Sequence, residues 1–191
     1  MSAYLEVRNW DELFGRSQGK VVGSRLGVSY MQAQLGEVSV KVAGHEMLLK
    51  QCEMGLDAIS GVVWDAGKLL VDYLAGEHPD YPLGTVLDIG CGTGICGLAA
   101  GYLSATSVTL SDVVVTDALQ YNINNAVESV GKIKPSTCED RIHFVPYNWN
   151  SPELPETLLE KFDVVLCSDV LYDAKFHRPF LECLQKLTFK V

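Results

Sequence analysis

The 191-residue sequence contains no apolar run of the ~20 residues that a membrane-spanning helix needs. Its six cysteines form no Cys-x-x-Cys pair and its four histidines have no ligand spacing, so neither a metal site nor a dithiol redox motif is predicted. Basic residues are also few, because 15 Lys and Arg against 24 Asp and Glu give a formal net charge of −9. These absences disfavour a membrane protein, a zinc protein and a nonspecific nucleic-acid binder. The negative charge either favours a basic partner or only maintains solubility.

The N-terminal stretch MSAYLEVRNWDELFG carries acids and has no apolar segment, so it predicts neither a secretory nor a mitochondrial signal. We therefore expect a cytoplasmic protein, and the nucleus stays open as a further compartment. Hydrophobic residues make up 48% of the chain and charged residues 20%, as in ordinary globular proteins. A chain of this length without repeats most simply forms one globular unit.

The pattern of apolar residues predicts a β-hairpin near the N-terminus. Residues 38–42 alternate valine with polar residues, and a glycine turn separates them from a second run at 46–52. The period then changes to that of a helix, which ends near Gly76. We therefore divide the chain into a β-hairpin extension, residues 1–60, and a core, residues 61–191.

Strands and helices alternate through the rest of the sequence. Strands are predicted at 85–89, 107–111, 141–145 and 162–167. Helices are predicted at 95–103, at 115–130 with Val115 on the inner face and Asn122, Asn124 and Asn125 mostly at the surface, and around Pro179. We place Pro179 in the first turn of the last helix and expect Phe180, Leu184 and Leu187 to face inward. The fold class is α/β, a Rossmann-like, doubly wound, mainly parallel sheet that binds ligands at the carboxyl ends of its strands.

The stretch VLDIGCGTG, residues 86–94, is an apolar strand followed by a glycine-rich turn. Its glycines allow a sharp turn and a close approach of the backbone to a ligand, and the next helix begins with its amides aimed at the same place. Residues 92–97 also satisfy the Gly-x-Gly-x-x-Gly pattern of dinucleotide-binding proteins. The turn alone is therefore compatible with NAD and with S-adenosylmethionine.

Two acidic residues discriminate between NAD and S-adenosylmethionine. Asp112 ends the second strand and is suited to a ribose diol, which both cofactors have. Asp88 lies two residues before the first glycine, where it would repel a pyrophosphate and attract the ammonium of a methionine moiety, directly or through water. Asp88 can also hold the amides of the turn itself. We therefore expect S-adenosylmethionine as the cofactor.

At these residues the sequence resembles the class I S-adenosylmethionine-dependent methyltransferases. Three further stretches resemble the seven-strand protein-lysine methyltransferases named for an Asp-x-x-Tyr motif: GVVWDAGKLL at 61–70, the pair Asn148-Trp149, and SDVLY at 168–172. The resemblance runs from about residue 40 to the end of the sequence. It implies a protein-lysine N-methyltransferase whose partner is a protein substrate, of the chaperone or translation-factor type, and neither nucleic acid nor a membrane.

The resemblance also implies the site residues. The cofactor-binding residues are Trp64, Asp88, Gly90, Cys91, Gly92, Asp112, Trp149 and Ser168, and the catalytic residues are Asp169 and Tyr172. Either tryptophan can instead be an ordinary core aromatic. Three alternatives to the function stay open, namely methylation of a protein histidine, methylation of a small amine, and a noncatalytic binding module.

Asp169 and Tyr172 bear most on mechanism. Methyl transfer needs a neutral amine held in line, whereas a free lysine has a pKa of about 10.4 and is charged at neutral pH. A carboxylate at the end of the fourth strand can accept a hydrogen bond from that amine, and Tyr172 can form a wall or supply a hydroxyl. The alternative is that Asp169 caps a turn and that Tyr172 only packs.

The sequence departs from the family pattern at its C-terminal end. The family fold has seven strands, whereas this sequence ends one helix after the fourth strand, and residues 187–191 are expected to begin a fifth. We therefore expect an incomplete sheet with an open edge, and a cofactor half that is more complete than the substrate half. Whether such a chain is active stays open.

Overall fold

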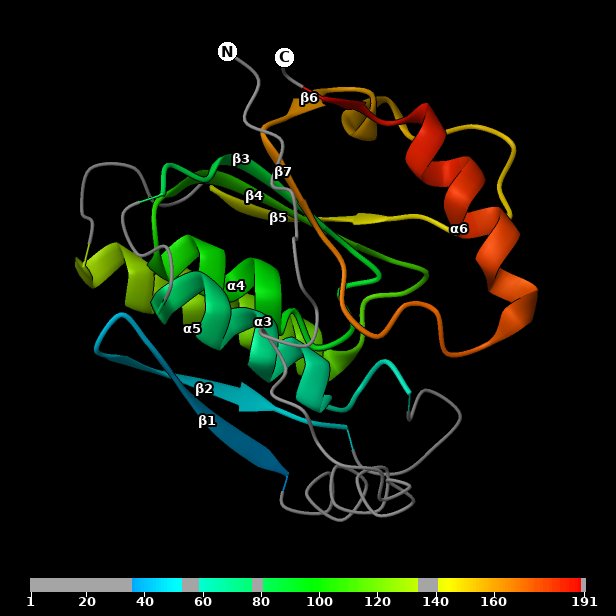
Figure 1. Ribbon diagram of the computed structural model, residues 1–191. Coiled ribbons are helices and arrows are strands. Elements are labelled where there is room, and N and C mark those ends of the chain that lie inside the picture. The colour runs from blue at the N-terminus through cyan, green and yellow to red at the C-terminus, as the bar shows by residue number, and fades with distance from the viewer. Residues whose placement is uncertain (1–35, 53–58, 77–80, 134–140, 190–191) are drawn as a thin grey trace, which may run out of the picture.

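The computed structural model of the chain describes residues 36–52, 59–76, 81–133 and 141–189. At its centre lies a four-stranded parallel sheet in the order β5-β4-β3-β7 (Figure 1). The strands are β3 (Gly84–Ile89), β4 (Ala105–Asp112), β5 (Ile142–Pro146) and β7 (Val164–Leu166). Helices cover both faces, so the predicted Rossmann-like α/β fold is confirmed.

The two central strands are buried because both of their faces are covered. In β3 the side chains of Leu87 and Ile89 belong to one hydrophobic cluster, whereas Val86 belongs to the cluster on the opposite face. β3 pairs with β4 through Leu87↔Thr109 and with β7 through Leu87↔Val165. The alternation of side chains along the strand therefore decides which layer each residue of β3 meets.

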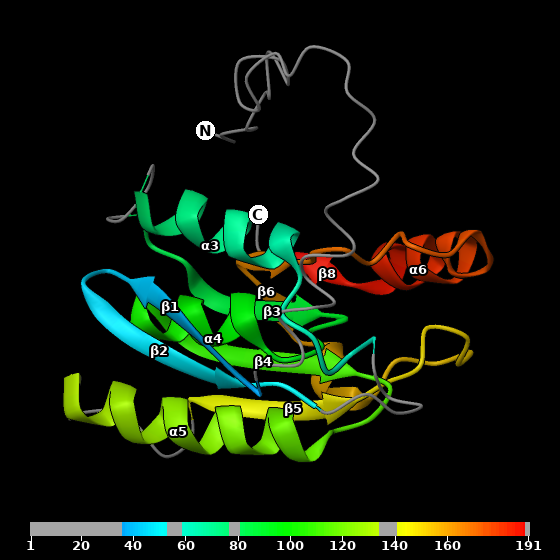
Figure 2. The same ribbon diagram turned by 90° about the horizontal axis from the view of Figure 1, so that it is seen from below.

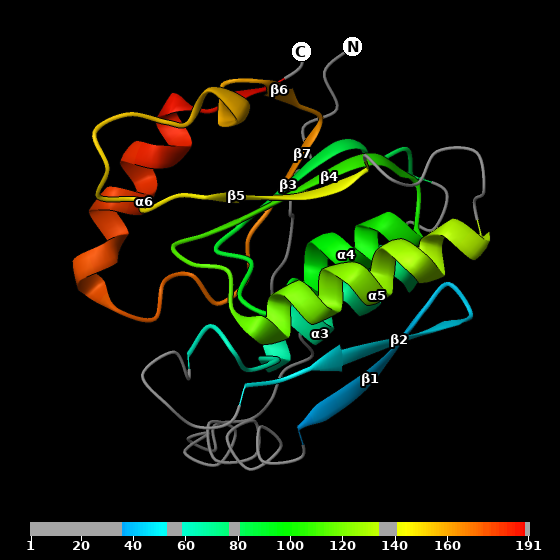
Figure 3. The ribbon, with the colours of Figure 1, turned by 180° about the vertical axis from the view of Figure 1, so that it is seen from behind.

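Three helices cover one face of the sheet and one covers the other (Figures 1 and 3). The first face carries α3 (Asp65–Gly76), α4 (Ile95–Tyr102) and α5 (Asp117–Ile133), and the second carries α6 (Ala174–Lys186) with the short 3-10 helix η1 (Glu156–Leu158). All eight residues of α4 are buried, because it lies between the sheet, its two neighbouring helices and the hairpin. No helix in the described ranges has the length and apolarity that crossing a membrane would require.

The predicted hairpin consists of β1 (Glu37–Val42) and β2 (His45–Lys50), which pair antiparallel around a turn at Ala43-Gly44. It lies on the outer side of the helices, away from the sheet (Figures 2 and 3). Alternate residues face those helices and join the hydrophobic core, namely Val40, Val42, Met47 and Leu49. The hairpin therefore shares its core with the layer of α3, α4 and α5.

The fourth predicted strand is divided into two. β6 (Lys161–Phe162) and β7 are separated at Asp163, whose carboxylate accepts hydrogen bonds from the Thr85 backbone N–H and hydroxyl, both at 2.8 Å. β8 (Thr188–Phe189) pairs with β6 in parallel, which confirms the expected start of a fifth strand. A contact between residues 78 positions apart sets this division, so the local sequence does not reveal it.

Three details of the helices differ from the predictions. Val115 is 40% exposed rather than inward, because the Thr116 hydroxyl accepts a hydrogen bond from Leu119 N–H and α5 begins only at Asp117. Pro179 lies inside α6 rather than in its first turn, because Asp173 caps that helix earlier. Asn122 was expected at the surface of α5 but is 1% exposed.

Candidate active site

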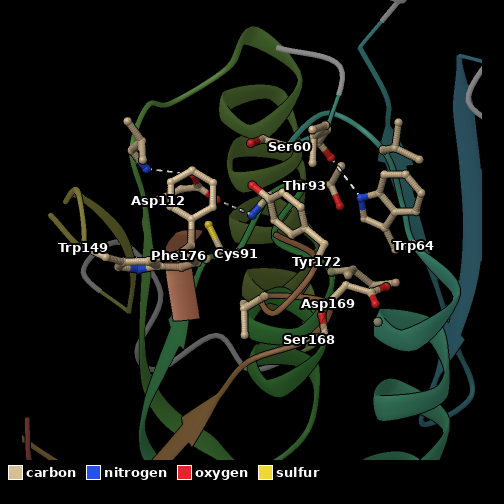
Figure 4. Close-up of a pocket in the computed structure, with 18 of the residues that line it drawn as sticks. Ser60, Trp64, Cys91, Thr93, Asp112, Trp149, Ser168, Asp169, Tyr172 and Phe176 are labelled. Carbon is tan, nitrogen blue, oxygen red and sulfur yellow. Dashed lines mark hydrogen bonds between the residues drawn. The ribbon is translucent and has the colours of Figure 1, made fainter. Parts of the chain in front are cut away.

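A cavity lies at the carboxyl ends of β3, β4, β5 and β7 (Figure 4). The turn after β3, the end of β4, the loop after β5, the loop after β7 and residues 59–67 all contribute to its lining. Of the ten predicted site residues, nine line it: Trp64, Gly90, Cys91, Gly92, Asp112, Trp149, Ser168, Asp169 and Tyr172. Sequence motifs from distant parts of the chain are thus brought together, and Asp88 is the exception.

The glycine turn forms the floor of the cavity from backbone atoms. Gly90, Gly92 and Gly94 have positive φ angles of 71°, 54° and 82°, a region that only glycine adopts readily. A Cβ at Gly90 would lie 2.9 Å from both Trp149 and Val170, and one at Gly92 would lie 3.0 Å from the Ser60 carbonyl. The absence of side chains therefore lets two walls of the cavity close onto the turn.

Asp112 joins the end of β4 to this floor. One carboxylate oxygen accepts a hydrogen bond from Gly92 N–H at 2.9 Å, and the other accepts one from Val113 N–H at 2.7 Å. Burial raises the pKa of this carboxyl, and the two backbone donors oppose that shift. A carboxylate oxygen has more than one acceptor site, so Asp112 can still bind hydroxyl groups of a ligand.

Asp88 lies outside the cavity. It is 2% exposed, and its carboxylate accepts a hydrogen bond from Gly97 N–H of α4 at 2.7 Å. Burial raises the pKa of the carboxyl to about 7. The structure therefore gives Asp88 the alternative role of holding backbone amides beneath the turn, and direct contact with a ligand ammonium has no support from its position.

The two predicted tryptophans lie on opposite sides of the cavity (Figure 4). The Trp64 indole N–H donates a hydrogen bond to the Ile59 carbonyl at 2.9 Å, which restrains the orientation of the ring. Trp149 packs against Phe180 and Phe176, with ring centroids 4.9 and 6.2 Å apart. Both rings are only partly buried and present apolar faces to the cavity.

The Asp-x-x-Tyr stretch follows β7 at the mouth of the cavity. Asp169 has a positive φ of 53°, and its carboxylate accepts a hydrogen bond from Ala66 N–H in the first turn of α3. Partial burial raises the pKa of this carboxyl, and the Ala66 donor opposes the shift. Tyr172 is 57% exposed and packs against Phe176 with ring centroids 6.0 Å apart. The acid is thus anchored to α3, while the tyrosine ring is accessible to an incoming molecule.

Ten further lining residues were not predicted as site residues, and four of them are polar or aromatic, namely Ser60, Thr93, Asn148 and Phe176. Thr93 and Asn148 lie inside quoted motifs, so their neighbours were a usable signal, whereas nothing in the sequence marks Ser60. The Thr93 hydroxyl is buried and has no hydrogen-bond partner within the described ranges. A buried hydroxyl normally has a hydrogen-bond partner, so the Thr93 hydroxyl is a candidate to bond a ligand.

The charges of the lining residues discriminate between cofactors. The described lining includes Asp112 and Asp169 but no lysine, arginine or histidine. A pyrophosphate would meet two carboxylates and no cation, which is unfavourable. A ligand with a ribose diol, a sulfonium and an amino-acid end fits the acids, the backbone floor and the Thr93 hydroxyl. The residues present therefore fit S-adenosylmethionine better than NAD.

The fold and the cavity define a Rossmann-like methyltransferase. Residues 43–190 match the family described as lysine methyltransferase. The chain belongs to this family, whose members take their methyl group from S-adenosylmethionine.

Individual relatives are more distant. EEF1A lysine methyltransferase 3 of Mus musculus is 29% identical over 132 residues, which are 68% of this chain and 51% of the relative. The histidine protein methyltransferase 1 homolog of Bos taurus is 28% identical over 174 residues, covering 75% of this chain and 47% of the relative. The chain spans about half the length of these relatives. Among solved structures, PKMT2 from Rickettsia typhi in complex with AdoHcy is 20% identical with a TM-score of 0.36, covering 56% of this chain and 19% of that one.

Proposed function

We propose that this chain transfers a methyl group from S-adenosylmethionine to a lysine side chain of a protein substrate. The observation that carries the proposal is the position of Asp169 and Tyr172 at the mouth of a cavity floored by the glycine turn and Asp112. The family to which the chain belongs supports the same reaction. The cofactor supplies an electrophilic methyl group on its sulfonium.

The residues that would hold the cofactor differ in chemistry. Asp112 offers acceptor sites for the ribose, Gly90 and Gly92 allow the ligand to approach the backbone, and Thr93 offers a hydroxyl that has no partner among the described residues. Trp64 and Trp149 provide the apolar faces on either side. Ser168 lines the cavity beside the catalytic acid, and its hydroxyl lies 3.5 Å from the Cys96 sulfur. Cys91 acts as a neutral apolar residue, because burial raises the pKa of its thiol.

We propose that Asp169 binds the amine of the substrate lysine. The amine must lose a proton before it can attack, and a carboxylate of raised pKa is a better acceptor for that proton than an ordinary surface aspartate. Its bond to Ala66 N–H keeps the carboxylate at the mouth and leaves acceptor sites open. Tyr172 and Phe176 would flank the aliphatic part of the lysine and exclude water from it.

The names of similar proteins bear on the class of substrate. A similar protein is named an EEF1A lysine methyltransferase, which supports a substrate of the translation-factor type, and the chaperone type stays open. A second candidate function is methylation of a protein histidine, because another similar protein is named a histidine protein methyltransferase. A cytoplasmic location stays a prediction from the sequence.

The test is labelled methyl transfer from S-adenosylmethionine to proteins of a cell extract. We expect the wild-type chain to label a protein and Asp169→Ala to lose at least ~99% of that labelling, because removal of a positioned proton acceptor costs about two orders of magnitude or more. Asp72→Ala, which removes an exposed acid of α3 that does not line the cavity, should leave labelling unchanged. Calorimetry should show that Asp169→Ala still binds S-adenosylmethionine.

Acid hydrolysis of the labelled protein identifies the acceptor. Label in methyl-lysine supports the proposal, and label in methyl-histidine supports the second candidate. Cofactor binding without any transfer by the wild-type chain would identify a noncatalytic module. Tight binding of NAD with no response to S-adenosylmethionine would refute the proposal altogether.

A further inference from the structure

The end of β2 lies against two walls of the cavity without lining the cavity itself. Lys50, Gln51 and Cys52 are absent from the lining, yet Gln51 and Cys52 bond the segment 59–64 directly, and Lys50 bonds Asn122, which in turn bonds the glycine turn. One wall is the glycine turn after β3. The other is the segment 59–64, which carries Trp64.

Asn122 of α5 connects this strand end to the glycine turn. Its side-chain oxygen accepts a hydrogen bond from Lys50 N–H at 2.6 Å, and its side-chain nitrogen donates to the Lys50 carbonyl at 3.0 Å. The same nitrogen donates its second hydrogen to the Thr93 carbonyl at 3.1 Å. Both amide hydrogens and the amide oxygen are therefore used in a side chain that is 1% exposed.

The bond from Asn122 to the Thr93 carbonyl affects a residue that lines the cavity. The Thr93 backbone carbonyl accepts the bond from Asn122, and Thr93 also lines the cavity and carries a hydroxyl without a partner in the described part of the chain. Thr93 lies between Gly92 and Gly94, two residues with positive φ whose lack of side chains gives the backbone on either side more conformational freedom. The bond from Asn122 therefore restrains the Thr93 peptide, beside the bonds that Gly92 N–H donates to Asp112 and Gly94 N–H donates to the Cys91 carbonyl.

Gln51 and Cys52 hold the opposite wall. The Gln51 side-chain oxygen accepts a hydrogen bond from Val63 N–H at 2.8 Å, one residue before Trp64, and Gln51 is 2% exposed. Cys52 N–H donates to the Gly61 carbonyl at 3.0 Å, and a Cβ at Gly61 would lie 2.5 Å from the Cys52 Cβ. The two segments are therefore in direct contact.

From these contacts we propose that Asn122 and Gln51 are positioning residues, through which the hairpin sets the affinity of the cavity for its cofactor. The inference rests on the proposed function only in that the cavity binds S-adenosylmethionine. Asn122 sets the orientation of Thr93, and Gln51 sets the position of Trp64. The hairpin is then a structural part of the cofactor site, although it supplies no lining residue among the residues described.

The first test compares Asn122→Asp with Asn124→Asp. The change at Asn122 keeps an acceptor for Lys50 N–H, but it removes both amide donors and places a negative charge beside the Lys50 and Thr93 carbonyls. Asn124 is the control, because it is exposed on the same helix and bonds only Gln120 among the contacts described. We expect the Kd of Asn122→Asp for S-adenosylmethionine to rise about tenfold or more in the folded protein, since one hydrogen bond to a charged or polar partner can account for a factor of ten. Asn124→Asp should bind as the wild type does.

The second test uses the wild-type chain, so it does not depend on the variant folding. Amide hydrogen exchange with and without S-adenosylmethionine should show added protection at the N–H groups of Lys50 and Val63, neither of which lines the cavity. Asn122→Asp with a wild-type Kd and only a lowered Tm would overturn the inference, and so would unchanged protection at both amides while the cofactor binds. Absence of binding by the wild-type chain would instead refute the proposed function, and the inference with it.

Discussion

Replacement of Gly90 by alanine tests whether the close fit between the glycine turn and Trp149 builds the site. Two costs are expected. An alanine at φ 71° costs about 1–2 kcal/mol relative to glycine, because its Cβ approaches the following carbonyl oxygen. The new Cβ would also lie 2.9 Å from Trp149 and from Val170, and relief of such overpacking in a filled core costs about 1–3 kcal/mol.

Gly44→Ala is the matched control for the backbone cost. Gly44 has a φ of 81°, yet no atom of the described residues lies within 4 Å of a Cβ built there. It should therefore lower the free energy of unfolding by about 1 kcal/mol, the cost of the backbone conformation alone. Gly90→Ala should lower it by about 3 kcal/mol, the sum of both costs.

Urea denaturation of the three proteins measures this difference, and calorimetry measures binding of S-adenosylmethionine to each. Because Gly90→Ala displaces Trp149, which lines the cavity, its Kd should rise about tenfold, whereas Gly44→Ala should bind as the wild type does. Equal losses of stability in the two variants, with unchanged affinity in both, would show that the contact between Gly90 and Trp149 contributes nothing to the site.

Two further predictions concern the core. Burial raises the pKa of Asp88 to about 7 in the folded chain from 3.8, so its contribution to stability is fully present below about pH 4 and is lost as pH rises through about 7. Asp88→Asn removes this titration. Between about pH 5 and about pH 8, the free energy of unfolding of the variant should therefore rise relative to that of the wild type by roughly 2–3 kcal/mol, measured by urea denaturation. A difference that stays constant over this pH range would contradict the raised pKa of Asp88. Leu158→Ala should lower the free energy of unfolding by about 2–5 kcal/mol, because Leu158 is fully buried in the hydrophobic cluster that includes residues of α6. Leu159 is 54% exposed, so Leu159→Ala should change the free energy of unfolding by less than about 0.5 kcal/mol. Thermal denaturation measures both variants.

Local sequence patterns predicted the features that depend on local chemistry. The strand-turn-helix at 84–102 follows from an apolar run, three glycines and a run of small residues, and each can be recognised without knowledge of the rest of the chain. The Asp-x-x-Tyr stretch was located through its resemblance to a family motif, which is also confined to a few neighbouring residues. Once the strands are parallel, their carboxyl ends meet at one edge, so the motifs predict a shared cavity as well as separate turns.

The features that the sequence did not reveal depend on contacts between distant residues. The burial of Asn122 requires the Lys50 backbone, 72 positions away, and a polar residue on a helix gives no sign of such a partner. The break between β6 and β7 requires Thr85 in the same way. Asp88 is a different case, because it shares the face of Val86 in β3, and strand alternation alone would have directed it toward α4.

The shared core of the hairpin and the helices limits how the chain can be divided. A fragment that begins at residue 61 would keep every lining residue from Val62 onward, yet it would leave bare the helix surface that Val42, Met47 and Leu49 cover. The hairpin and the rest of the chain therefore share one hydrophobic core across the boundary at residue 60. Deletion of the hairpin, which contributes no side chain to the described lining, would remove part of the support on which the cavity rests.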